Sequence, residues 1–157
     1  MKKGTVISTV IGFVGGVVLG GAMTAKQGTE RERKVDKFKT YYVMLNQWLA
    51  LKEEGKNLEE YFLKNNYRNI ALYGMGEMGR HLCEELKGSQ VNIQYAIDKE
   101  AEDIVADMQV FSLQDVKDTN VDAVIVSAVF AFDEIEDELK GVFKCPVISL
   151  EDVIYEV

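Results

Sequence analysis

The chain has 157 residues, with 18 basic and 26 acidic side chains, one histidine, two cysteines and one proline. This length allows one ordinary domain with an appendage, and 47% hydrophobic residues suffice for a buried core, so wholesale disorder is excluded. Cys83 and Cys145 lack CxxC spacing, which excludes a disulfide framework and a structural zinc site of the usual kind.

The net charge of −8 is spread unevenly. Residues 1–25 carry +2 and residues 26–39 carry +3, so the rest of the chain carries −13. Nucleic-acid binding depends chiefly on Lys and Arg side chains that neutralise phosphates. The strong negative charge of the chain after residue 39 therefore argues against DNA or RNA as a partner.

Residues 4–25 are uncharged and rich in Val, Ile and Gly. As a helix they would span a hydrocarbon layer of about 30 Å, and the flank that follows is more basic than the one before, which favours a cytoplasmic C-terminal side. We expect a transmembrane anchor over residues 1–26, in a single-pass protein of the cell membrane with a cytoplasmic C-terminal domain. A cleaved signal peptide or a helix lying on the membrane surface is the alternative.

Gly12, Gly16 and Gly20 recur every fourth residue in this segment. Small residues at that spacing let a second helix approach closely, which predicts a homo-oligomer or a membrane-protein partner. The alternative is that these glycines only reflect the composition of membrane helices.

Residues 27–56 are expected to form a linker helix that is first basic and then amphipathic. Apolar residues step along it by three and four, at Val35, Phe38, Tyr42, Leu45 and Leu49. Further apolar residues widen this stripe, namely Tyr41, Met44, Trp48 and Leu51. The stripe needs a cover, which is the downstream domain, a coiled-coil partner or the membrane surface.

From residue 57 to residue 157 the pattern predicts an α/β domain. A short helix capped by Asn57 comes first and ends at Asn65-Asn66. Strands are expected at 69–73, 91–97, 110–111, 121–127 and 146–150, and helical segments at 78–87, 113–116 and 133–139. Asp133 and Glu136 predict a capping box for the last of these helices. The alternation predicts a Rossmann-like, three-layer, doubly wound parallel sheet of about five strands in the order 3-2-1-4-5.

The run from Gly74 to Gly79 matches GxGxxG where a strand passes into a helix. In such a turn Gly74 allows the tight bend, Gly76 lets a pyrophosphate approach the backbone, and Gly79 lets the helix pack on the sheet. Asp98 ends the next strand, where a carboxylate accepts hydrogen bonds from ribose hydroxyls. We therefore expect a nucleotide site; the alternative is that the glycines only build a tight turn.

Other residues extend this candidate site. Arg80 begins the helix beside the expected phosphate, and Ser127 and Ala128 end the fourth strand and would wall the nucleotide. The full candidate set for cofactor binding is Gly74, Met75, Gly76, Glu77, Met78, Gly79, Arg80, Asp98, Lys99, Ser127 and Ala128.

The pattern assigns no catalytic residue and no metal site. Tyr95 and Lys99 spell YxxxK, but a strand does not place both side chains on one face as a helix does. His81 and Glu85 stand one helical turn apart, and two ligands without a third make no metal centre.

The runs 69–79, 95–99 and 146–152 carry a resemblance to a known family. They resemble the small Rossmann-like nucleotide-sugar-binding domains of bacterial capsule and exopolysaccharide proteins, often labelled nucleoside-diphosphate-sugar epimerase-like. The resemblance covers residues 57–157. It implies that Gly74, Gly76, Gly79 and Asp98 hold a nucleotide diphosphate, with NAD(P) or a nucleoside-diphosphate-sugar as the ligand.

These observations together predict a membrane-anchored cytosolic nucleotide-binding module connected with polysaccharide biosynthesis. Two alternatives stay open. One is a sugar-nucleotide epimerase or oxidoreductase component that a partner or a second copy completes, and the other is an NAD(H)-sensing regulatory domain.

Overall fold

The structure is a computed structural model that describes residues 30–157. The chain divides into two compact units, Met1–Tyr42 and Val43–Val157, and a helix over residues 30–53 contributes to both. The predicted anchor at 4–25 and its glycines Gly12, Gly16 and Gly20 lie outside the described residues. Among residues 30–157, no helix is both long and apolar enough to cross a membrane.

The second unit contains a five-stranded, all-parallel sheet. Its strands are β1 (Asn69–Tyr73), β2 (Asn92–Ile97), β3 (Val110–Phe111), β4 (Ala123–Val126) and β5 (Val147–Ser149). The strand order is β3-β2-β1-β4-β5, which confirms the predicted α/β class and topology. All four residues of β4 are buried, as expected for a central strand that is covered on both faces.

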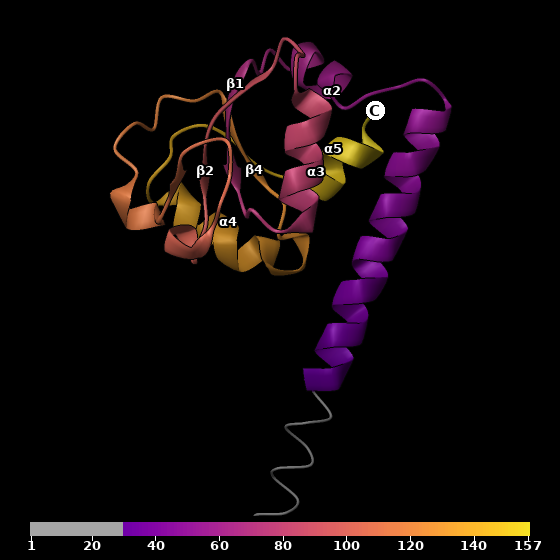
Figure 1. Cartoon of the computed structure of the whole chain (residues 1–157), viewed down its shortest axis with the longest axis horizontal. Coiled ribbons are helices and arrows are strands. Elements are labelled where there is room, and N and C mark those ends of the chain that lie inside the picture. The colour runs from indigo at the N-terminus through magenta and orange to yellow at the C-terminus, as the bar shows by residue number, and fades with distance from the viewer. Residues whose placement is uncertain (1–29) are drawn as a thin grey trace, which may run out of the picture. The chain divides into compact units, whose positions relative to one another are not determined.

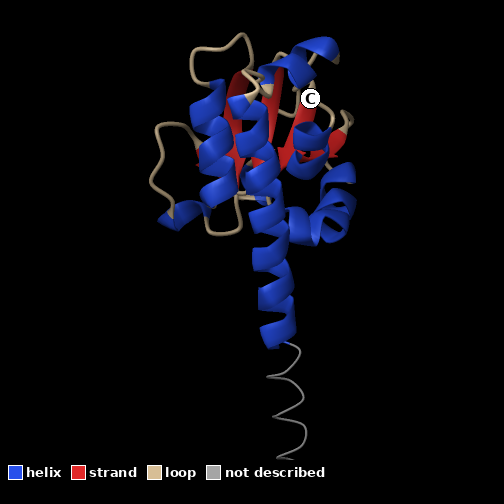
Figure 2. Ribbon diagram, turned by 90° about the vertical axis from the view of Figure 1, so that its right-hand side faces the viewer, coloured by secondary structure: helices blue, strands red, loops and turns tan. Residues whose placement is uncertain are grey.

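Helices cover both faces of this sheet. The unit contains α2 (Glu59–Lys64), α3 (Glu77–Leu86), α4 (Phe132–Lys140) and α5 (Leu150–Tyr155). The connections β1-α3-β2 and β4-α4-β5 run in opposite directions along the sheet, so right-handed crossovers place α3 and α4 on opposite faces (Figure 1). Figure 2 shows the strands behind the helices on the α3 side.

The α4 side of the core shows why neighbouring residues of the central strands are all apolar. Ile135 and Leu139 of α4 pack in one cluster with β-strand residues that include Tyr73 and Val126. Leu72, next to Tyr73 in β1, is also fully buried. Because neighbouring strand residues point to opposite faces, Leu72 faces the α3 side. Both faces of the sheet are therefore buried at β1.

Three local predictions are wrong. Helix α4 begins at Phe132 with Ala131 at its N-cap, because the turn η3 (Val129–Ala131) runs straight into it, so Asp133 caps nothing. Helix α2 has Leu58 rather than Asn57 at its N-cap. Strand β5 ends at Ser149, whose Oγ accepts a hydrogen bond from Glu151 N at 3.3 Å and opens α5, which the pattern did not predict.

The amphipathic linker helix is buried along the edge of its predicted stripe rather than at its centre. Met44, Trp48 and Leu51 are buried, within the second unit. Leu45 and Leu49, at the centre of the stripe, are 39% and 57% exposed. Within residues 43–53 the domain therefore covers one side of the helix only.

Glu85 of α3 fastens this helix to the domain. Its carboxylate, 6% exposed, accepts hydrogen bonds from Trp48 Nε1 at 2.5 Å and Leu58 N at 2.7 Å, and pairs with Lys52 Nζ at 2.5 Å. His81, one turn earlier on α3, packs edge-on against the Trp48 ring, with centroids 6.3 Å apart. The bond to Leu58 N also fixes the start of α2, because Leu58 is the N-cap residue of that helix and has no side-chain cap bond.

Replacing Glu85 should therefore destabilise the domain. We expect Glu85→Ala to lower the free energy of unfolding by about 3 kcal/mol, because a buried amide and the indole N–H lose a charged acceptor. Glu84→Ala is the matched control, since its side chain is 72% exposed and should cost less than about 0.5 kcal/mol. Urea unfolding followed by circular dichroism measures both; equal losses would contradict the structural role of Glu85.

Candidate functional site

The glycine turn between β1 and α3 is built on two close approaches. Gly74 has φ of +96°, which favours glycine. A Cβ at Gly79 would lie 2.0 Å from the carbonyl oxygen of Gly74. Gly74 and Gly79 are thus required by the turn itself, as the sequence pattern predicted.

Gly76 has no such structural reason. Its φ of −69° and ψ of −167° are open to any residue, and a Cβ there would meet nothing within 4 Å. Neither the backbone nor the packing explains this glycine. Its missing side chain leaves the main chain accessible at the tip of the turn.

Main-chain N–H groups gather at this tip. Gly76 is the N-cap of α3 and has no side-chain cap bond, and the first N–H groups of a helix have no acceptor inside it. Together with the positive end of the helix dipole they suit a phosphate. Glu77, in the first turn, is exposed and places a negative charge beside them.

Asp98 lies against the turn, as predicted, but it also has a structural task. Its Oδ2 accepts a hydrogen bond from Met75 N at 2.7 Å, and its Oδ1 accepts one from Glu100 N at 3.0 Å. The carboxylate thereby holds the turn to the end of β2. Each oxygen retains a second lone pair for a ligand hydroxyl.

Ser127 holds the turn from the other side. It is buried, and its Oγ donates a hydrogen bond to the Gly74 carbonyl at 2.7 Å. Ala128 follows it and is half-buried, while Met75 and Met78 are buried. The candidate residues with exposed positions are Gly76, Glu77, Arg80 and Lys99.

A cavity of about 520 Å³, with both polar and apolar lining, opens beside Asp98 at the carboxyl ends of β1, β2 and β3. Lys99 borders it, with its Nζ 3.7 Å from Glu138 Oε1. Burial raises the pKa of the Tyr73 hydroxyl at its inner end, and the carboxylates of Glu138 and Asp98 raise it further. The lining residues are Tyr73, Ile97, Asp98, Lys99, Ser112, Leu113, Gln114 and Glu138.

The sequence pattern missed the far wall of this cavity. Ser112 and Gln114 follow β3, and Glu138 comes from α4. No spacing links these residues to the glycine turn, because only the strand order brings their segments together. The predicted strand order could have pointed to Ser112, because this residue directly follows the expected strand at 110–111.

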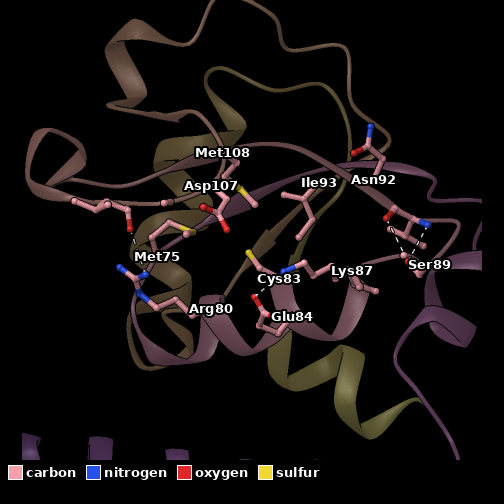
Figure 3. A pocket seen from close by; sticks show the side chains of 15 residues that line it. Met75, Arg80, Cys83, Glu84, Lys87, Ser89, Asn92, Ile93, Asp107 and Met108 are labelled. Atoms are coloured by element: carbon pink, nitrogen blue, oxygen red, sulfur yellow. Dashed lines mark hydrogen bonds and ion pairs between the residues drawn. The ribbon is translucent and has the colours of Figure 1, made fainter.

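A second hollow, of about 770 Å³, adjoins the turn at Met75 (Figure 3). We call it the α3 groove, because helix α3 and residues 105–108 form its two sides. Met75 and Arg80 lie at one end and Ser89 and Asn92 at the other (Figure 3). The Arg80 guanidinium donates a long hydrogen bond of 3.4 Å to the Val105 carbonyl.

Tyr95 and Lys99, the YxxxK pair that was rejected as catalytic, contact different partners. The Tyr95 hydroxyl donates a hydrogen bond of 2.5 Å to the Asp118 carbonyl, whereas Lys99 pairs with Glu138. Among residues 30–157, no cluster of three or more His, Cys, Asp or Glu side chains could hold a metal ion.

Comparison with known proteins identifies a family. The family model described as "C2185-like, N-terminal" matches residues 66–144, just over half of the chain, so the chain belongs to this family. The match runs from β1 through α4 and includes the glycine turn and Asp98. No curated protein and no solved structure gives a significant match.

Two alanine variants separate the roles of the glycines. We expect Gly79→Ala to cost about 3 kcal/mol of unfolding free energy, because its methyl group would overlap the Gly74 carbonyl. Gly76→Ala should cost about 1 kcal/mol or less, the ordinary cost of alanine at an N-cap. Thermal or urea unfolding measures both; a Gly76→Ala loss as large as that of Gly79→Ala would show that Gly76 is structural too.

Proposed function

We propose that this member of the C2185-like family binds a nucleotide through its diphosphate at the glycine turn. The observation that carries the proposal is Gly76, an exposed glycine at the N-cap of α3 that neither conformation nor packing requires. A pyrophosphate needs such an approach to the backbone.

The cavity beside Asp98 supports placing the nucleoside there. The Asp98 carboxylate lines it and keeps lone pairs for ribose hydroxyls, and the Lys99 ammonium offers a cation near the phosphate. A volume of about 520 Å³ lies in the usual range for small-molecule sites. NAD(P) and nucleoside-diphosphate-sugars share the chemistry that this site would recognise.

The wider setting comes from the resemblance. A membrane-anchored cytosolic module that captures a nucleotide-sugar or a dinucleotide for polysaccharide biosynthesis stays a prediction, as do its alternatives of an epimerase or oxidoreductase component and an NAD(H) sensor. Binding at the turn is common to all three and is therefore the step to test first.

Calorimetric titration of the full-length protein with NAD, ADP, UDP-glucose and coenzyme A tests the proposal. We expect at least one ligand to bind, and Gly76→Val to weaken it by about tenfold or more, because the branched side chain would occupy the diphosphate position. Gly141→Val is the matched control, since Gly141 is exposed at the end of α4 with φ of −73°. No binding by any ligand, or equal binding by Gly76→Val, would refute the proposal.

Glu77 gives a test of the opposite sign. A carboxylate beside the helix N-terminus repels a phosphate, so Glu77→Gln should tighten nucleotide binding by about two- to fivefold. Glu60→Gln, a change of the same kind in the first turn of α2, should leave the affinity unchanged. Weaker binding by Glu77→Gln would place the phosphate elsewhere.

A further inference from the structure

The α3 groove exists because the crossover from β2 to β3 contains little helix. Within residues 98–109 the described structure has one short turn, η1 (Ala101–Asp103), and then an irregular segment. A full helix in this connection would cover the sheet beside α3. Here residues 105–108 leave an open groove along α3 instead.

The groove begins at the glycine turn. Met75, the residue between the first two glycines, lines one end. Arg80, Glu84 and Lys87 follow along one face of α3, and the groove continues to Gly88 and Ser89. At about 1.5 Å per residue this is a run of roughly 12 Å. A ligand with its diphosphate at the turn would have this groove directly beside it.

The groove walls are more apolar than polar, and their apolar part is aliphatic. Apolar contacts come from Met75, Leu86, Val91, Ile93, Val105, Ala106 and Met108, and none of the described residues that line the groove is aromatic. Aromatic side chains are a common platform for stacking bases, and this groove offers none. Such walls favour a flexible chain over a flat ring.

The charged side chains of the groove are equal in number for each sign, and some of its polar groups already have partners within the protein. Arg80 and Lys87 stand against Glu84 and Asp107, so the formal charges cancel. Lys87 Nζ lies 3.6 Å from Glu84 Oε1, and the Ser89 hydroxyl bonds to the Val91 backbone. A second phosphate needs net positive charge, which these side chains do not supply, and a sugar has little apolar surface to set against the aliphatic walls. An uncharged chain with a few amide and hydroxyl groups can use both the walls and the remaining polar groups, which include Asn92.

We propose that the α3 groove holds the uncharged, flexible arm of a nucleoside-diphosphate ligand, of the chemical class represented by the pantetheine arm of coenzyme A. The proposal rests on the proposed function, because it places the diphosphate of the same ligand at the glycine turn. It narrows the ligand class to nucleotides that carry a chain in place of a sugar or a second nucleoside.

The two cysteines supply a position-specific measurement. Cys83 lines the groove, whereas Cys145 packs against the core cluster on the α4 face. Both are free and half-buried, and burial raises the pKa of both thiols. At one fixed alkaline pH, alkylation of Cys83 therefore reports occupancy of the groove, and alkylation of Cys145 in the same sample is the internal control.

The experiment is iodoacetamide labelling of the full-length native protein, with each cysteine followed by peptide mass spectrometry. The ligands are desulfo-coenzyme A, which has the arm without a reactive thiol, and ADP, NAD and UDP-glucose at equal fractional saturation from calorimetry. We expect desulfo-coenzyme A to slow Cys83 alkylation by about tenfold, and the three other ligands by less than about twofold, with Cys145 unchanged.

A variant at the rim of the groove gives a second measurement. Val105 is 88% exposed, so Val105→Asp should leave the fold intact while it places a charge against the chain. We expect it to reduce the protection of Cys83 by desulfo-coenzyme A by about fivefold or more. Val142→Asp, on an exposed side chain that follows α4, is the matched control and should protect as the unaltered protein does.

The possible results separate the two proposals. Suppose that ADP or NAD binds, and that Cys83 is alkylated as fast with desulfo-coenzyme A as with ADP or NAD. The arm proposal is then wrong and nucleotide binding stands. If NAD or UDP-glucose protects Cys83 as well as desulfo-coenzyme A, the groove holds a ring and the arm proposal is again wrong. If none of the four ligands binds by calorimetry, both proposals fail together.

Discussion

The contact between the end of β1 and the start of α3 is the constraint on which the candidate site depends. Gly79 touches the Gly74 carbonyl so closely that any side chain there would collide with it. The Ser127 hydroxyl holds that same carbonyl from β4, and the Asp98 carboxylate holds the next amide from β2. Three neighbouring strands thus fix one short loop, which places its N–H groups before any ligand arrives, and binding then loses little conformational entropy.

Two hollows adjoin this loop, the cavity beside Asp98 and the α3 groove. Both mix polar and apolar groups, and the apolar lining of the groove is aliphatic. Met75 lines the groove and Asp98 lines the cavity. The Met75 N–H donates a hydrogen bond to the Asp98 carboxylate, so a single hydrogen bond links the groove to the cavity. A ligand with a diphosphate at its centre and unlike groups at its ends would match this order of surfaces.

Local sequence patterns predicted the sheet order, the glycine turn and Asp98, because each depends on short-range periodicity or on a motif whose glycines have a steric role. They failed where contacts with groups distant in sequence determine the local structure. The N-cap of α2 is Leu58, whose amide Glu85 of α3 holds, rather than Asn57, and helix α5 begins at Leu150 where an apolar run indicated only a strand. The α3 groove was also missed, since an absent crossover helix leaves no positive signal in a sequence.

The contact between Trp48 and Glu85 has an optical consequence. Trp48 is the chain's single tryptophan, it is 5% exposed, and its indole N–H is bound to a buried carboxylate of α3. Intrinsic indole emission of the intact protein therefore originates from one junction, where the linker helix meets the helix that begins at the glycine turn. Its wavelength serves as a native, label-free gauge of whether those two helices remain joined.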